Sequence, residues 1–270
     1  KYRYGARWLI ASFPKSGTHF AESFLKPIAN RMPPTPLNDH PWVGTFSGNG
    51  FNRKWQDTRR VCYLLAGIKA GCYYKAHLGW KEEIEQFLWY MGTCVIFVYR
   101  DFRDVAVSQA FHVLADDDQR FCHPDKDYYR SLDSFEDVLL AVINGTEKFP
   151  GIFERWADYA PWLNVRWVLQ MPFESMKTRP RDCADIIIRY GLKRPAAVWN
   201  MIPKLNEEGV KLVVDKMVQA AQTPALSPSF RKGEIGGWQE HFTPKVKAAF
   251  KAADKDGWMK RMSYEENDSW

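Results

Sequence analysis

The segment PKSGTHF, residues 14–20, has the residue types that bind an anion. It follows a short apolar run and precedes a helical pattern, so the amides of Ser16, Gly17 and Thr18 are expected at a helix N-terminus, where anions bind. Gly17 allows close approach of the backbone, and Lys15 adds a positive charge. A tight turn before a capped helix, with no ligand, would have a similar sequence. The preceding strand and Lys15 favour a phosphate site instead. The segment is not a Walker A loop, in which Lys follows the glycines.

Two further segments place cations beside groups that bind phosphate. Arg100 directly follows a buried apolar run, and Ser108 lies one turn into the next helix. An Arg and a hydroxyl converging at a strand end suit a phosphate, although Arg100 could instead pair with Asp101 or Asp104 at the surface. The late segment RKGEIGGW suits another phosphate, or is a solvated basic loop. Its candidate residues are Arg231, Lys232 and Gly233.

These three segments together resemble the cytosolic-type sulfotransferases, which use 3′-phosphoadenosine-5′-phosphosulfate (PAPS). PKSGT matches the family's 5′-phosphosulfate loop, and YRDFRDVAVS and RKGEIGGWQEHFT resemble its two 3′-phosphate segments. The resemblance runs from about Trp8 to Phe250. It implies transfer of a sulfuryl group from PAPS to a hydroxyl, or an amine, of a small-molecule acceptor, with adenosine 3′,5′-bisphosphate (PAP) as the product. No metal is expected.

The resemblance also implies the catalytic residues. The segment KAHL stands where the family has Lys-Thr-His-Leu, so His77 corresponds to the general base and Lys75 to its basic companion. Lys15 would stabilise the leaving 5′-phosphate, and Ser108 would help to position Lys15. Without the resemblance, His77 would be interpreted as an ordinary His beside a helix start. Imidazole suits the role because its pKa lies near neutrality.

The adenine and acceptor sites follow the family less closely. Phe20 and Phe173 stand where the family has a Trp and a Tyr, so stacking on adenine and core packing both stay open. His19 replaces the family's usual second Thr. The hydroxyl donor of that Thr is lost, so the imidazole or the backbone amide of His19 must be the donor instead. The acceptor pocket is expected to include Phe13, Trp80 and His123. The acidic residues near it form either a solvated face or a rim that selects a cationic acceptor: Asp116, Asp117, Asp118, Asp125 and Asp127.

The elements that must position these groups alternate between strands and helices. Strands are expected at residues 7–13, 93–99 and 165–169, and helices at 18–30, with Thr18 as the cap, and at 81–91, 104–115, 133–144, 180–190 and 244–253. Residues 31–60 and 222–237 are expected to be irregular. The pattern predicts a single α/β domain over residues 1–270, with a mainly parallel central sheet flanked by helices and a P-loop-like strand, loop and helix.

The composition excludes several other classes. The net charge of +6, without a dense Lys or Arg tract, suits an anionic ligand better than nucleic acid. Five irregularly spaced cysteines favour neither a disulfide framework nor a zinc site, so a cytoplasmic location fits best. No apolar run is long enough to span a membrane. Gly237 replaces the Asp of the family's G-D-W. Gln239, Pro244 and Ala248 depart from the family's dimerisation pattern, so dimerisation through residues 239–248 is not expected.

Two rival functions remain at the level of the sequence. A P-loop nucleotide or small-molecule kinase shares the strand, loop and helix, but it would need Mg²⁺ and a Walker-type Lys. A nucleotide-binding module that has lost catalysis would share the fold as well. The joint presence of Lys15, His77 and Ser108 argues against the second rival.

Overall fold

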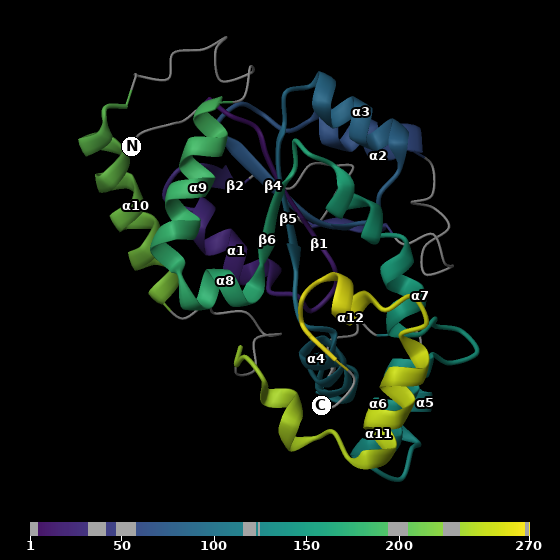
Figure 1. Cartoon of the computed structure of the whole chain (residues 1–270). Coiled ribbons are helices and arrows are strands. Elements are labelled where there is room, and N and C mark those ends of the chain that lie inside the picture. Colours follow the sequence, from purple (N-terminus) through teal and green to yellow (C-terminus); the bar gives the residue numbers. More distant parts are fainter. Residues whose placement is uncertain are drawn as a thin grey trace. The chain divides into compact units, whose positions relative to one another are not determined.

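The apolar run WLIAS forms β1 (Trp8–Ser12), and every residue of this strand is buried. The computed structural model describes residues 5–31, 42–46, 58–115, 123, 125–193, 205–223, 233–267 and 270 (Figure 1). β1 is the middle strand of a sheet with the order β2-β4-β1-β5-β6, in which β3 also pairs with β4 and all pairs are parallel. The other strands are β2 (Asn30–Arg31), β3 (Trp42–Phe46), β4 (Cys72–Leu78), β5 (Cys94–Tyr99) and β6 (Leu169–Pro172). The predicted α/β class with a mainly parallel sheet is confirmed.

The register of the sheet fixes which chain segments share an edge. Ala11 pairs with Ala76, and Ser12 pairs with Val98. Because parallel strands all end at the same side, the turn after Ser12 and the last residues of β4 lie at one edge. The carboxyl edge of a parallel sheet is where ligands bind in α/β folds.

The described chain divides into two compact units, the first of which holds the sheet. This sheet unit comprises Lys1–Gly48, Asn52–Tyr99 and Tyr159–Phe230. Figure 1 shows α1, α8, α9 and α10 on one side of its sheet and α2 and α3 on the other. Their bounds are α1 (Thr18–Leu25), α2 (Thr58–Ala66), α3 (Glu82–Tyr90), α8 (Phe173–Thr178), α9 (Pro180–Lys193) and α10 (Glu207–Gln222), and a 3₁₀ helix covers Ala160–Asn164.

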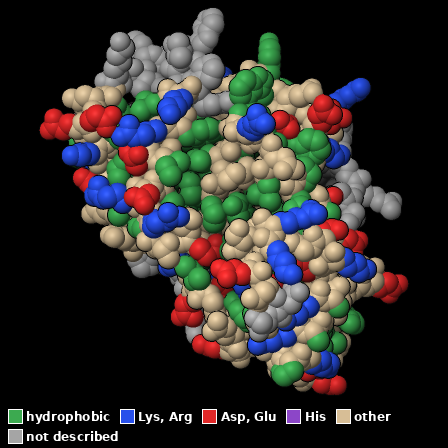
Figure 2. Space-filling model, in the orientation of Figure 1, with side chains coloured by type: hydrophobic (Ala, Val, Ile, Leu, Met, Phe, Trp, Pro, Cys, Tyr) green, Lys and Arg blue, Asp and Glu red, His purple; other side chains and the backbone are tan. Residues whose placement is uncertain are grey.

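The helices pack through apolar side chains that alternate along the strands. Trp8 and Ile10 of β1 join one core with Phe24 of α1 and Ile187 of α9. α9 approaches β1 closely at Gly191, where an added Cβ would lie 2.6 Å from the Trp8 ring. The outer faces of α9 and α10 carry interspersed cations and anions (Figure 2), which pair as Arg181 with Asp215 and as Arg189 with both Asp185 and Glu207.

The second compact unit is helical. This helical unit comprises Asn49–Phe51, Arg100–Asp158 and Arg231–Trp270. Its core packs aromatic rings at steep angles to one another, with the Phe102 ring centroid 4.9 Å from that of Trp156 and the Phe153 centroid 5.1 Å from that of Phe250. Its helices are α4 (Phe102–Ala115), α5 (Lys126–Arg130), α6 (Phe135–Asn144), α7 (Ile152–Ala157), the 3₁₀ helix Gly237–Glu240, α11 (Pro244–Ala253) and α12 (Trp258–Arg261). α11 lies beside α6 in Figure 1.

Several expected elements differ from the structure. The expected strand at 165–169 is wrong, because residues 160–164 form a 3₁₀ helix and the strand is β6, four residues later. The expected helix at 18–30 ends at Leu25, because Pro27 has no backbone N–H with which to continue the helical hydrogen bonds. The structure also contains β4, α2 and α10, which the pattern did not predict.

Candidate active site

The turn between β1 and α1 is tightly bonded to the sheet. The N–H of Phe13 donates to the carbonyl of Val98 at 3.1 Å, and the N–H of Ser16 donates to the carbonyl of Phe13 at 3.2 Å. Lys15 has a φ of 66°, in the left-handed region that costs a residue with a side chain about 1–3 kcal/mol. Backbone strain of this kind clusters at ligand-binding and active sites. The turn is therefore built to hold Lys15 in one place.

Gly17, and not Thr18, takes the N-cap position of α1. Its φ is 92°, and no side chain caps the helix, so the expected capping role of Thr18 is wrong. Instead the Thr18 hydroxyl lies 2.7 Å from the hydroxyl of Ser12. An added Cβ at Gly17 would lie only 2.4 Å from the ring of Phe173. Both the φ angle and the contact with Phe173 therefore require glycine.

The turn retains unused polar groups. Within the described residues, no hydrogen bond joins the N–H of Gly17 or Thr18, and the fully buried hydroxyl of Ser16 has no partner. A buried hydroxyl without a partner costs about 1–3 kcal/mol. An anion with several oxygens placed at this turn would satisfy these groups, so the residues present fit a phosphate or phosphosulfate group.

Two aromatic residues flank the turn. Phe173 is the first residue of α8, and its ring centroid lies 5.7 Å from that of Phe20 in an edge-on arrangement. The ammonium of Lys177 lies 5.4 Å from the Phe20 centroid. The structure thus brings the two predicted adenine-stacking residues together beside the turn. Phe173 is also part of the core, so packing accounts for its burial.

His77 is the second-last residue of β4 and faces the end of β1. Its Nδ1 lies 3.2 Å from the carbonyl oxygen of Ser12 and 3.1 Å from the Ser12 hydroxyl. A carbonyl oxygen only accepts, so Nδ1 carries a proton and Nε2 of the neutral ring has the lone pair. The hydroxyl of Tyr159 also donates to the carbonyl of His77 at 3.4 Å. His77 lies on a strand and not beside a helix start, and its tautomer leaves Nε2 able to accept a proton.

Lys75 lies two residues earlier in β4 and is only 2% exposed. Its ammonium lies 2.5 Å from Oε2 of Glu22 and 3.0 Å from Nδ1 of His19. The hydroxyl of Tyr73 donates to the other carboxylate oxygen of Glu22 at 2.9 Å. The charge of Lys75 is therefore balanced by Glu22, a residue that the sequence analysis did not single out.

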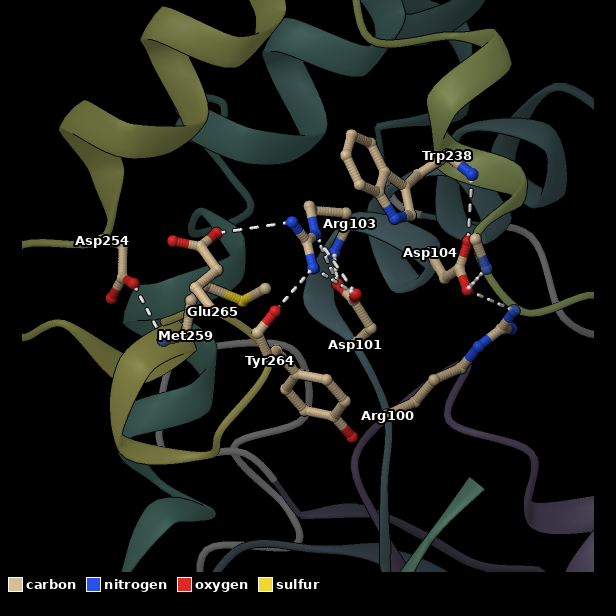
Figure 3. Close-up of polar contacts among 10 residues, drawn as sticks. Arg100, Asp101, Arg103, Asp104, Trp238, Asp254, Met259, Tyr264 and Glu265 are labelled. Atoms are coloured by element: carbon tan, nitrogen blue, oxygen red, sulfur yellow. Dashed lines mark hydrogen bonds and ion pairs between the residues drawn. The ribbon is translucent and has the colours of Figure 1, made fainter. Parts of the chain in front are cut away.

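In the helical unit, Arg100 and Asp104 hold the late segment. Asp104 accepts hydrogen bonds from the N–H groups of Gly236 at 2.9 Å and Trp238 at 3.0 Å, and its carboxylate lies 3.1 Å from the Arg100 guanidinium (Figure 3). Arg100 also donates to the carbonyl of Glu234. The predicted alternative partner of Arg100, Asp104, is thus present, but the pair is buried and not at the surface.

Arg103 forms a second buried centre in this unit. Its guanidinium lies 4.2 Å from the ring centroid of Trp238 and 4.5 Å from that of Trp270, and it donates to Asp101 at 2.7 Å. Figure 3 shows Glu265 and the Tyr264 carbonyl on its other side, at 3.5 Å and 3.1 Å. Arg103 and Asp104 together anchor the late segment to α4.

Comparison with known proteins identifies the family. A sequence model of the sulfotransferase domain matches residues 6–263. This chain belongs to the sulfotransferase domain family. No curated protein matches it in sequence.

Solved structures of sulfotransferases share the fold. Mouse sulfotransferase SULT7A1 complexed with PAP is 19% identical, with 97% of this chain and 86% of that chain covered and a TM-score of 0.57. Retinol dehydratase with androsterone and the inactive cofactor PAP is 15% identical, with 94% and 82% covered and a TM-score of 0.53. Retinol dehydratase with retinol and PAP is 16% identical, with 94% and 84% covered and a TM-score of 0.53.

The other predicted site residues of this sulfotransferase domain lie in both units. Phe13 is fully buried with its ring 5.2 Å from that of Tyr159, and Trp80 donates to Glu85 at 2.7 Å. His123 is buried with its ring 4.4 Å from that of Phe149, and its Nδ1 accepts from a backbone N–H. Ser108 lies on α4, and Gly233 has a φ of 59°. Arg231 and Lys232 lie outside the described residues.

Across the described ranges, no three His, Cys, Asp or Glu side chains are grouped so that they could hold a metal ion. Among the same residues, no helix combines the length and the apolar character needed to cross a bilayer.

Proposed function

We propose that this chain transfers a sulfuryl group from PAPS to a hydroxyl group of a small-molecule acceptor, with His77 as the general base. The observation that carries the proposal is the tautomer of His77. Its Nδ1 donates to the Ser12 carbonyl, so Nε2 holds the lone pair that a base needs. His77 stands at the carboxyl edge of the sheet, beside the anion-fitting turn that follows β1.

PAPS supplies the activated sulfuryl group. His77 accepts the proton of the acceptor hydroxyl at Nε2 while the acceptor oxygen forms its bond to sulfur and the bond from sulfur to the 5′-phosphate oxygen breaks. Lys15 offers its positive charge to that phosphate oxygen, which becomes negative as it leaves. The Ser12 carbonyl stabilises the protonated imidazole through Nδ1.

The turn residues bind the cofactor in this proposal. The hydroxyl of Ser16 and the N–H groups of Gly17 and Thr18 hold the 5′-phosphosulfate, for which they have unused hydrogen-bonding capacity. Phe20 and Phe173 contact the adenine ring. By the family resemblance, Arg100, Ser108 and Gly233, together with Arg231 and Lys232, hold the 3′-phosphate. PAP in the SULT7A1 and retinol dehydratase structures supports PAPS as the donor.

A small-molecule acceptor is supported by the ligands of the structural relatives, androsterone and retinol. Phe13, Trp80 and His123 remain the proposed pocket residues. Of the acidic residues that could have selected a cationic acceptor, Asp125 is buried and accepts from the Thr146 hydroxyl, so it cannot form a rim. Asp116, Asp117 and Asp118 lie outside the described residues.

Four further expectations stay predictions. They are a single domain over residues 1–270, a cytoplasmic location, independence from metal ions, and the absence of dimerisation through residues 239–248. In that segment the Thr243 side chain caps α11 and donates to Glu136 of α6.

The test is a titration of the protein with PAP, ATP and ATP with Mg²⁺, followed by an acceptor screen with labelled PAPS. We expect PAP to bind without metal and to bind more tightly than adenosine 5′-phosphate. Loss of the 3′-phosphate removes at least one charge-assisted contact, worth roughly 1.5–3 kcal/mol. Tighter binding of ATP with Mg²⁺ than of PAP would favour the kinase alternative.

A further inference from the structure

Glu22 lies at the centre of a buried polar cluster in the sheet unit. It is on the first turns of α1, is only 4% exposed, and accepts hydrogen bonds from Lys75 and Tyr73 of β4. Oε2 of Glu22 also lies 3.5 Å from Nδ1 of His19. Four polar side chains therefore meet between β4 and α1, the helix that begins at the anion-fitting turn.

The charges in this cluster are fixed by their partners. Burial alone would raise the pKa of Glu22, but the hydrogen bond and the charge of Lys75 and the hydrogen bond from Tyr73 outweigh it and hold that pKa well below its usual range. Glu22 is thus ionised, and at 2.5 Å it keeps the amine of Lys75 in its ammonium form. A buried ion pair in this arrangement balances its own charge.

This arrangement decides the protonation of His19. An ammonium group has only donors, so the Nδ1 atom that lies 3.0 Å from Lys75 must accept, and the proton of the neutral ring is on Nε2. The His19 side chain is 30% exposed at the second position of α1, so its ring reaches the surface next to the turn. His77 has the opposite tautomer, because its Nδ1 donates to a carbonyl.

We propose that Lys75 is a positioning residue which, anchored by Glu22, holds His19 as an Nε2–H donor to the anion bound at the turn. The proposal rests on the proposed function and assigns the side chain, and not the amide, of His19 to the phosphosulfate. It also gives Lys75 a role other than that of companion to the base. One histidine then presents an N–H to the anion, and the other presents a lone pair to the acceptor.

The first experiment needs no ligand. Proton-to-nitrogen correlation NMR of the histidine rings, assigned with His19→Leu, reports which ring nitrogen carries the proton. We expect Nδ1 of His19 to be unprotonated in the wild-type protein. In Lys75→Met, Nδ1 of His19 loses its donor, while the carboxylate of Glu22, which only accepts, remains beside it. This nitrogen should therefore become protonated. The exposed Lys211→Met on α10 is the matched control and should leave the spectrum unchanged. A wild-type His19 protonated at Nδ1 would overturn the proposal.

The second experiment measures PAP binding by calorimetry. His19→Leu should weaken PAP binding roughly tenfold or more, because a hydrogen bond to a charged group is lost, and His19→Gln, which keeps an N–H donor, should recover part of it. Equal affinity in His19→Leu and wild type would overturn this inference alone. Failure of the wild-type protein to bind PAP would instead overturn the proposed function.

The same titration separates the two roles of Lys75. A positioning role predicts that Lys75→Met weakens PAP binding at about pH 8.5, above the range in which imidazoles ordinarily titrate. A companion to the base predicts unchanged PAP affinity and a lower kcat, and that result would contradict the proposal. Because His19 is partly exposed, its variants test the proposal even where Lys75→Met fails to fold.

Discussion

The Nδ1 atom of His77 lies 3.2 Å from the carbonyl oxygen of Ser12, and this contact joins the end of β4 to the end of β1. This bond makes His77 a base with a defined orientation. His77→Ala should reduce turnover roughly 10²–10⁴-fold, the range usual for a positioned acid or base, and leave PAP affinity nearly unchanged. Steady-state kinetics at saturating acceptor and calorimetry check both parts. Near-native turnover in this variant would mean that the base is elsewhere.

Lys15 should matter more for turnover than for binding. Its charge is needed most when the 5′-phosphate oxygen becomes negative, so Lys15→Ala should lower kcat by a larger factor than it raises the Kd of PAP. Rapid-quench kinetics and calorimetry on the same protein measure the two factors. A variant that changes only the KM for PAPS would show that Lys15 acts in binding alone.

The conformation of Gly17 can be tested against a matched glycine. Gly17→Ala meets both an unfavourable φ and the Phe173 ring, whereas Gly257→Ala, at a φ of 65°, meets nothing within 4 Å. We expect a loss in free energy of unfolding of about 1 kcal/mol for Gly257→Ala and at least ~1 kcal/mol more for Gly17→Ala. Urea denaturation measures both. If Phe173→Leu does not relieve part of the Gly17→Ala defect, the contact with the ring is not its cause.

Asp104 should be essential for the order of the late segment. Asp104→Asn removes the charge partner of the buried Arg100 and weakens the hydrogen bonds from Gly236 and Trp238. We therefore expect the free energy of unfolding to fall by about 3 kcal/mol. Asp215→Asn, in the exposed pair with Arg181, should change stability by less than about 1 kcal/mol. Thermal and urea unfolding of the two variants provide the comparison, and equal effects would contradict the anchoring role.

The stability that Glu22 contributes should depend on pH. Its folded pKa lies below the value of about 4.3 usual for an unfolded chain, so this contribution is present above that value and is lost as the pH falls through the folded pKa. The difference in unfolding free energy between wild type and Glu22→Gln should therefore be largest near pH 7 and shrink below about pH 4. Urea titrations across this range measure it, and a constant difference would count against an ionised Glu22.

The sequence predicted well the elements whose apolar pattern is unbroken. β1 and β5 are apolar runs, α6 at Phe135–Asn144 lies within the predicted helix 133–144, and α11 has the predicted bounds. β4 was not predicted because Lys75 and His77 interrupt its pattern. Those residues are tolerated in a buried strand only because Glu22 and Ser12 satisfy them.

The sequence contains a pattern that could have predicted α10, but none that could have singled out Glu22. α10 has buried side chains at helical spacing, Val210, Val213, Val214 and Met217, and Asn206 caps its start. Glu22 had none, because the single carboxylate on an otherwise apolar helix face acquires meaning only once β4 lies beside it. Lys15, His77 and the turn were found from motif resemblance, whereas the tautomers of the two histidines depend on partners distant in the sequence.

The central place of β1 has a consequence for biosynthesis. Both neighbours of β1 come dozens of residues later in the chain, since Trp8 pairs with Tyr73 and with Cys94. While the ribosome is still making those strands, the nascent WLIAS segment has no partner for its backbone and no cover for its apolar side chains. Parallel sheets assembled from such distant segments form slowly and expose aggregation-prone surface meanwhile. Yield in a heterologous host should therefore depend on chaperones that shield this first strand until β5 has emerged.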